Sequence, residues 1–204
     1  MKNNRNISRK DRLKSKRLAP ANYLIVCEGK QTEPNYFNGL KKKINEKYGT
    51  KVDVLIPNIE IKGTGENTTA LVKYTDKFVN YSNKRYGQVW VVFDKAIKTC
   101  DYNVAWSNPN FELWLLSHFK KVNRYISKDN VLQELSKEFQ EKDLGEYTKN
   151  DINIFEKVTS EEGLHTAIKN CEYMEELNKN GQASQRNPMT KVYQIIDGLK
   201  EYLE

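Results

Sequence analysis

The chain has 204 residues, a formal net charge of +7 and three cysteines. This length is enough to bury the core of one domain with a small appendage, and a membrane-spanning segment of roughly 18 consecutive apolar residues is absent. The cysteines at positions 27, 100 and 171 have no metal-ligand spacing and leave one unpaired, so we expect a cytoplasmic protein without a secretory signal.

The first predicted element is a basic tail over residues 1–18. Residues 1–17 carry eight Lys or Arg and one Asp, which leaves 26 residues of each charge in the rest of the chain. We expect this tail to be disordered and to contact the phosphate backbone of a nucleic acid. A solubilising leader without any partner would have the same composition.

Strand and helix patterns alternate over residues 19–125. This alternation predicts an α/β core, with a mostly parallel sheet flanked by helices. The predicted strands cover residues 22–27, 52–61, 89–93 and 102–106, and the predicted helices cover 33–47 and about 68–83. A further helix is expected after Ser107, with Ser107 or Asn108 as its cap and Pro109 at its first helical position.

Residues 126–204 have a different pattern, with helical signals over 128–141, 160–179 and 188–203. We interpret this half as a helical C-terminal extension packed on the core. Capping of the sheet, substrate binding and formation of a homo-oligomer would all use the same pattern.

The connection between the last two predicted strands is short. Only the seven residues 95–101 separate Asp94 from the strand near Tyr102, whereas parallel neighbours normally need a crossover of about a dozen residues. Either the segment 102–106 is not a parallel neighbour of 89–93, or a loop of the natural protein is missing between Lys95 and Ala96. We favour the second explanation.

Carboxylates follow two of the predicted strands. Glu28 comes directly after the apolar run 23–27, and Asp94 comes directly after the run 89–93. Ligands of open α/β sheets bind at the carboxyl ends of strands, and Mg²⁺ or Mn²⁺ prefers carboxylate oxygens. With Glu112 in the first turns of the next helix, Glu28, Asp94 and Glu112 are the predicted catalytic and metal-binding acids. A helix cap or an ion pair would use the same residue types.

Phosphate or substrate binding is predicted close to these acids. A Gly63-Thr64-Gly65 loop precedes a helix, where backbone N–H groups can bind a phosphate, although a lone G-x-G is equally typical of a tight turn. The predicted phosphate-binding or substrate-binding residues are Gly29, Lys30, Glu33, Gly63 and Asn67.

Covalent catalysis has no support in the sequence, because no Ser–His–Asp or Cys–His context is present. His118 follows an apolar helix face and is interpreted as a packed histidine. Lys149 is one of several basic residues able to contact a phosphate, and most such residues are merely solvated.

Four sequence motifs, in order along the chain, resemble those of the RloB family. They lie at residues 25–37, 89–95, 105–114 and 187–192. The family is similar to Toprim domains, so the resemblance implies a Toprim-like (Rossmann-like) fold with a general acid/base glutamate at Glu28. It also implies a D-x-D metal pair that begins at Asp94, yet Ala96 stands at the second position. A missing loop after Lys95 would explain this departure as well.

The resemblance further implies a role in bacterial anti-phage defence, next to restriction–modification genes or in abortive infection. The expected activity is Mg²⁺-dependent hydrolysis of DNA or RNA, conceivably tRNA, with a defence-system ATPase as a partner. The alternative is a non-catalytic nucleic-acid-binding or nucleotide-sensing subunit that regulates the ATPase, and Ala96 favours this alternative.

Overall fold

The computed structural model describes residues 21–49, 54–94, 100–159, 162–182 and 185–203. The predicted basic tail, residues 1–18, and the proposed missing loop after Lys95 therefore lie outside the described residues. The strands are β1 (Tyr23–Cys27), β2 (Ile59–Gly63), β3 (Gln88–Phe93), β4 (Asn103–Asn108) and β5 (Met189–Thr190). The helices are α2 (Thr32–Tyr48), α3 (Thr68–Tyr81), α4 (Glu112–Ser117), α5 (Lys128–Glu141), α6 (Ile154–Val158), α7 (Gly163–Leu177), α8 (Tyr193–Gly198) and the 3₁₀ helix η2 (Lys200–Tyr202).

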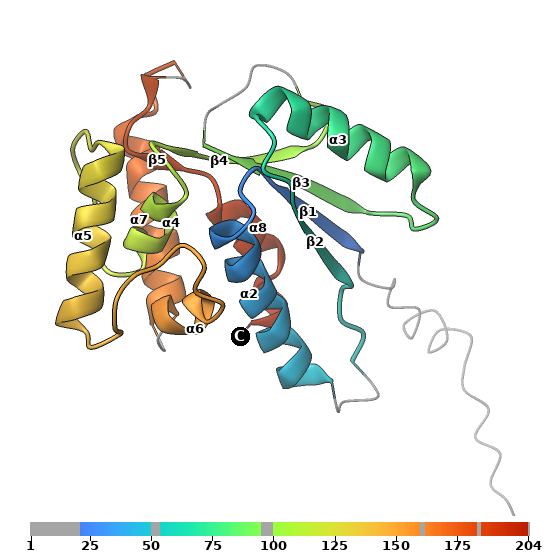
Figure 1. Ribbon diagram of the computed structural model, residues 1–204, viewed down its shortest axis with the longest axis horizontal. Coiled ribbons are helices and arrows are strands. Elements are labelled where there is room, and N and C mark those ends of the chain that lie inside the picture. Colours follow the sequence, from blue (N-terminus) through green and yellow to red (C-terminus); the bar gives the residue numbers. More distant parts are fainter. Residues whose placement is uncertain (1–20, 50–53, 95–99, 160–161, 183–184, 204) are drawn as a thin grey trace, which may run out of the picture.

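The strands form one five-stranded sheet in the order β2-β1-β3-β4-β5. The first four strands are parallel, and only β5 pairs in the antiparallel sense, with β4. Figure 1 shows α3 alone on one face of the sheet and the other helices gathered on the opposite side. The predicted class, a mostly parallel α/β sheet flanked by helices, is confirmed.

Strand β1 and most of β3 are apolar, as expected for parallel strands that helices cover on both faces. In β1, Ile25 and Cys27 pack into the large core under α2, α4 and the C-terminal helices. Leu24 and Val26 point to the other side and pack against Leu71 of α3. These four β1 side chains have an exposed fraction of 0%, and the run at 23–27 forms an interior strand of the sheet, between β2 and β3.

The expectation that so short a connection cannot join parallel neighbours is wrong. Strand β4 pairs in parallel with β3, in a register that places Asn103 opposite Trp90. From Phe93 the chain therefore returns over only three rungs, about 10 Å, and moves sideways by one strand spacing of about 4.8 Å. The nine residues 94–102 reach about 30 Å when extended, which is enough without a helix.

The boundary between β4 and α4 differs from the prediction. Ser107 and Asn108 end strand β4 instead of capping a helix, and α4 begins only at Glu112. The Asn108–Pro109 peptide bond is cis, as is the Asn187–Pro188 bond. Pro109 directly follows the end of β4 and Pro188 directly precedes β5. Proline is typical of such turns as well as of a helix start, and the sequence does not separate the two.

The C-terminal half also contributes to the sheet. The predicted helix over 188–203 is instead strand β5, helix α8 and the 3₁₀ helix η2. Thr190 of β5 pairs with Ser107 of β4, and the two hydroxyls are 2.8 Å apart. The short helix α6 lies between the predicted helices over 128–141 and 160–179, where no element was predicted. It packs Phe155 into the core beneath α2.

Within the described residues no helix is both long and apolar enough to cross a membrane.

The sheet order has a topological switch at β1: helix α2 leads outward to β2 on one side, and α3 returns the chain to β3 on the other. In open α/β sheets this is the place where a crevice forms beyond the carboxyl ends of the strands.

Candidate acidic active site at the sheet edge

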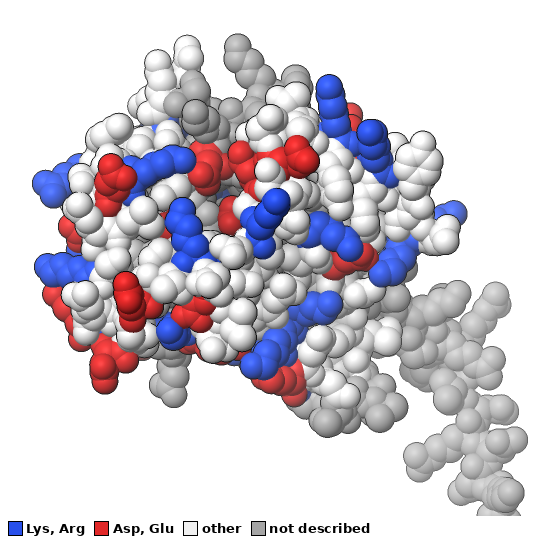
Figure 2. Space-filling view, in the orientation of Figure 1, with Lys and Arg blue, Asp and Glu red and all other residues white. Residues whose placement is uncertain are grey.

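An acidic cleft of about 480 Å³ lies at this switch point, and its lining includes the residues that follow β1 and β3. Its walls also come from the loop before α3, the start of α2 and the start of α4. Figure 2 shows acidic side chains gathered at this end of the sheet, with basic side chains beside them. The lining residues that carry charge are Glu28, Lys30, Glu33, Glu66, Asp94, Glu112 and Lys149.

Glu28 and Asp94 are connected through the backbone. The Glu28 N–H donates to the carbonyl of Val92 at 2.9 Å, which extends the β1–β3 pairing by one residue. The Glu28 carboxylate accepts from the Asp94 N–H at 3.2 Å, and the Asp94 carboxylate accepts from the Phe111 N–H at 3.2 Å. The two strand-end acids and the start of α4 are therefore held together as the sequence predicted.

Glu112 enters the same cleft from the first turn of α4. Its carboxylate accepts a hydrogen bond from the Tyr147 hydroxyl at 3.1 Å and lies 3.5 Å from the Lys149 ammonium. The Thr32 hydroxyl donates to the Lys149 carbonyl at 3.0 Å, which ties the 147–149 segment to the start of α2. The Glu112 side chain is 6% exposed, whereas the Asp94 side chain is 32% exposed. Glu112 is therefore the more deeply buried of these two predicted acids.

Glu33 is a fourth carboxyl group in the cleft. It is buried, and among the described residues its hydrogen-bond donors are backbone amides, including that of Gly29 at 3.3 Å. A side chain at position 29 would collide with this carboxylate, because a Cβ there would lie 2.1 Å from a Glu33 oxygen. Burial, together with the charges of Asp94 and Glu112, raises the pKa of Glu33 to about 7. Near neutral pH this group therefore both holds and releases a proton.

Asp94 is held by a cation that the sequence did not indicate. The Lys128 ammonium, at the start of α5, lies 3.2 Å from its carboxylate. Burial raises the pKa of Asp94, and the charge of Lys128 opposes this effect. Lys128 stands 34 residues along the chain in an ordinary polar position of a helix, so no local pattern reveals the contact.

The glycine loop packs against the turn that follows β1. The Thr64 and Gly65 amides donate to the carbonyls of Cys27 and Glu28, at 3.1 and 2.8 Å. Gly65 has φ +71°, and its missing side chain leaves room for the Lys30 stem. Because these amides already donate within the protein, a phosphate would be bound here by side chains and not by a backbone cradle.

Two further predicted residues have clear structural roles. The Asn67 side chain caps α3 by accepting from the Ala70 N–H at 3.1 Å. Gly63 ends β2 at a point where a Cβ would lie 2.6 Å from the Pro34 ring and 2.8 Å from the Gly29 carbonyl. Asn67 lines the cleft, whereas Gly63 is not part of its lining and packs behind it against Pro34 and Gly29. The predicted contact of either residue with a phosphate stays a prediction.

The chemistry of the cleft fits a cation better than a bare anion. Five carboxyl groups line it against two lysines, and carboxylate oxygen is the donor that Mg²⁺ and Mn²⁺ prefer. In the arrangement described, however, no three Asp, Glu, His or Cys side chains of the described residues are grouped to hold a metal ion. The buried Asn110 Oδ1, next to Phe111, has no hydrogen-bond partner there.

His118 is a packed residue, as expected. Its Nδ1 lies 2.9 Å from the Trp114 carbonyl and its Nε2 lies 3.2 Å from the Tyr36 hydroxyl. Burial lowers the pKa of His118 to about 4, so the neutral ring donates from Nδ1 and accepts at Nε2.

Tyr147, which contacts Glu112, was not singled out from the sequence, because a tyrosine in a polar connection carries no signal of its own.

Comparison with known proteins assigns a family but no close relative. No curated protein and no solved structure matches the chain. A family model described as RloB-like protein matches residues 23–199, which cover β1 through α8 and all the acids of the cleft. The resemblance seen in the four motifs is thereby confirmed, and the chain belongs to the RloB-like protein family.

Proposed function

We propose that this protein is a Mg²⁺-dependent nuclease that hydrolyses phosphodiester bonds of DNA or RNA within a bacterial anti-phage defence system. The observation that carries the proposal is the convergence of Glu28, Glu33, Asp94 and Glu112 on one cleft at the switch point of the sheet. A divalent cation bound by Asp94 and Glu112, with Glu28 beside them, would supply charge stabilisation to a phosphate.

The other roles belong to groups of the chain itself. Glu33, with its pKa raised to about 7, would exchange a proton with a water molecule in the cleft, which Glu28 also lines. Lys30 extends over Gly65 at the rim, and Lys149 lies beside Glu112. A phosphate that enters between these two ammonium groups would contact Lys30 and would compete with Glu112 for Lys149.

A second candidate function is a non-catalytic nucleic-acid-binding or nucleotide-sensing subunit of a partner ATPase. Two observations favour it. Lys128 and Lys149 already neutralise Asp94 and Glu112, and Ala96 stands where the family resemblance implies the second aspartate of the metal pair. A cation would then have to compete with two lysines for its ligands.

The test is cleavage of labelled DNA, tRNA and mRNA by the full chain with Mg²⁺, with Mn²⁺ and with EDTA. We expect metal-dependent cleavage that Glu28→Gln and Asp94→Asn each reduce by about 100-fold or more, as is usual for groups that stabilise transition-state charge. Glu46→Gln, an exposed substitution on α2 away from the cleft, is the matched control and should keep full activity.

Full cleavage by Glu28→Gln and Asp94→Asn would overturn the nuclease proposal. A phage-protection assay and a nucleic-acid binding assay on the same two variants separate the candidate functions. Protection and binding that persist in both variants, without any cleavage by the wild-type chain, would support the regulatory subunit.

A further inference from the structure

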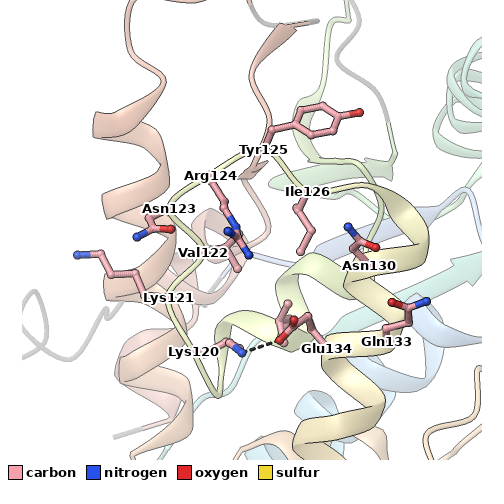
Figure 3. A pocket seen from close by; sticks show the side chains of 11 residues that line it. Lys120, Lys121, Val122, Asn123, Arg124, Tyr125, Ile126, Asn130, Gln133 and Glu134 are labelled. Carbon is pink, nitrogen blue, oxygen red and sulfur yellow. Dashed lines mark hydrogen bonds and ion pairs between the residues drawn. The ribbon is translucent and has the colours of Figure 1, made fainter.

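A second pocket of about 400 Å³ lies between helix α5 and the loop that precedes it. Figure 3 shows Arg124 directed into the space that the loop encloses, Asn130 and Gln133 on the α5 side, and Tyr125 at the rim. No predicted site residue belongs to this pocket. Its lining consists of Leu116, Lys120, Lys121, Val122, Asn123, Arg124, Tyr125, Ile126, Asn130, Gln133 and Glu134.

The loop is held in place before any ligand arrives. The Asn187 side chain accepts from the Ile126 N–H and donates to the Ile126 carbonyl, both at 3.0 Å, as a neighbouring strand would. Val122 and Ile126 have exposed fractions of 7% and 9% and belong to the large core. A preformed pocket binds without the cost of ordering its walls.

The lining combines the groups that bind a nucleotide. Leu116, Val122 and Ile126 provide an apolar floor, and the side-chain amides on the two walls both donate and accept hydrogen bonds, as base edges require. Tyr125 is 75% exposed, so its ring is free to stack on a base.

Positive charge is available at the same place. Lys120 is paired with Glu134 at 2.6 Å, and Lys121 lies over the Tyr173 ring, 3.3 Å from its centroid. Arg124, by contrast, makes no hydrogen bond or ion pair with any residue that the structure describes, and its side chain is exposed. The charge of Lys120 foremost, and that of Arg124 with it, lowers the pKa of Glu134 in the same lining. An exposed guanidinium next to an exposed tyrosine is suited to a phosphate beside a stacked base.

The pocket adjoins the acidic cleft. Helix α4 carries Glu112 in the cleft and Leu116 in the pocket floor, four residues apart, which is about 6 Å along the helix axis. Helix α5 begins with Lys128, which contacts Asp94, and continues with Asn130 in the pocket wall. A single strand that reaches both sites would therefore pass along the start of α5, between Lys128 and Asn130.

We propose that this pocket binds one nucleotide of a single-stranded nucleic acid whose neighbouring phosphate lies in the acidic cleft. Tyr125 stacks on the base, Arg124 binds a phosphate, and Asn130 and Gln133 contact the base edge. The assignment deepens the proposed nuclease function and rests on it for the path of the strand. It selects single strands over duplexes, because a base in a duplex is not free to stack on Tyr125.

The experiment measures binding without cleavage. Fluorescence anisotropy in EDTA follows the full chain with a labelled single strand of about ten nucleotides, as RNA and as DNA, and with the matching duplex. AMP serves as a competitor. We expect Tyr125→Ala and Arg124→Ala each to weaken single-strand binding at least about fivefold, which corresponds to about 1 kcal/mol, and to leave duplex binding within about twofold.

Matched controls are Tyr81→Ala and Arg85→Ala. Tyr81 is 87% exposed at the end of α3, and Arg85 is exposed just before β3, at the amino ends of the strands and far from the pocket. Both should bind single strands like the wild-type chain.

The inference is overturned if Tyr125→Ala and Arg124→Ala bind single strands within about twofold of wild type, or lose duplex binding equally. If Tyr125→Ala weakens the binding of AMP but not that of the oligonucleotides, the pocket binds a free nucleotide. That result would overturn the proposal that it binds a nucleotide of a single-stranded nucleic acid. Because no step requires cleavage, a failure of the nuclease proposal leaves a positive binding result intact.

Discussion

Replacing Glu33 by glutamine tests the electrostatics of the acidic cleft without any substrate or metal. Glutamine has the same shape, keeps an oxygen that accepts from the Gly29 N–H, and never carries a charge. At high pH the wild-type chain must bury a carboxylate close to Asp94 and Glu112, and the variant need not. Glu33→Gln should therefore stabilise the protein in alkaline solution.

The size of the effect follows from the pKa of Glu33. Its value in the folded protein, about 7, lies above the ordinary value of 4.5. The folded state thus holds the Glu33 proton more tightly than the unfolded state does. The stability that this group contributes is fully present below pH 4.5 and is lost as the pH rises through 7. At about 1.36 kcal/mol for each pKa unit, the loss amounts to roughly 3 kcal/mol.

The assay is urea unfolding in EDTA, followed by tryptophan fluorescence, for the wild-type chain and Glu33→Gln at about pH 5 and about pH 8. We expect the variant to gain roughly 3 kcal/mol relative to wild type at the higher pH, and less than about 1 kcal/mol at the lower. Apart from the charge, the amide introduced by Glu33→Gln changes the free energy of unfolding equally at both pH values. The quantity to compare is therefore how much the stability difference between Glu33→Gln and wild type changes with pH.

Glu46→Gln is the control, because this carboxylate is exposed on the same helix and stays solvated at either pH. Its stability difference from wild type should stay within about 0.5 kcal/mol throughout. A difference between Glu33→Gln and wild type that does not grow between the two pH values would refute the raised pKa and, with it, a proton-holding role for Glu33.

Two further predictions concern stability. His118 has the opposite pH dependence, because its pKa of about 4 in the folded protein lies below the ordinary value of 6.5. In urea titrations, the stability advantage of wild type over His118→Gln should shrink by roughly 3 kcal/mol as the pH falls from 6.5 toward 4. A difference that stays constant over this pH range would contradict the lowered pKa. Gly63→Ala should destabilise by about 1–3 kcal/mol in thermal unfolding, because its Cβ meets the Pro34 ring and the Gly29 backbone. Gly181→Ala, whose nearest contact would be 3.5 Å, is its control and should change stability little; equal effects of both substitutions would count against the steric argument.

The sequence predicted the elements that local patterns determine. The run at 23–27 is apolar on both faces, which is the pattern of an interior parallel strand, and it lies between β2 and β3 in the sheet. The helix predicted over 128–141 is confirmed with the same bounds as α5. In the structure the Ser127 side chain caps it. Strand β5 was missed because two residues carry no period, and their pairing with β4 depends on a partner about 80 residues away.

For the site, the sequence by itself determined that Glu28, Asp94 and Glu112 meet, because acids at the ends of parallel strands share one edge of the sheet. Only the tertiary structure decided what surrounds them. The raised pKa of Glu33 comes from burial among residues of three elements, and Lys128 and Lys149 reach the acids across the fold. Charge and desolvation act through space, so a pattern along the chain predicts which groups are present and the fold determines which of them hold a proton.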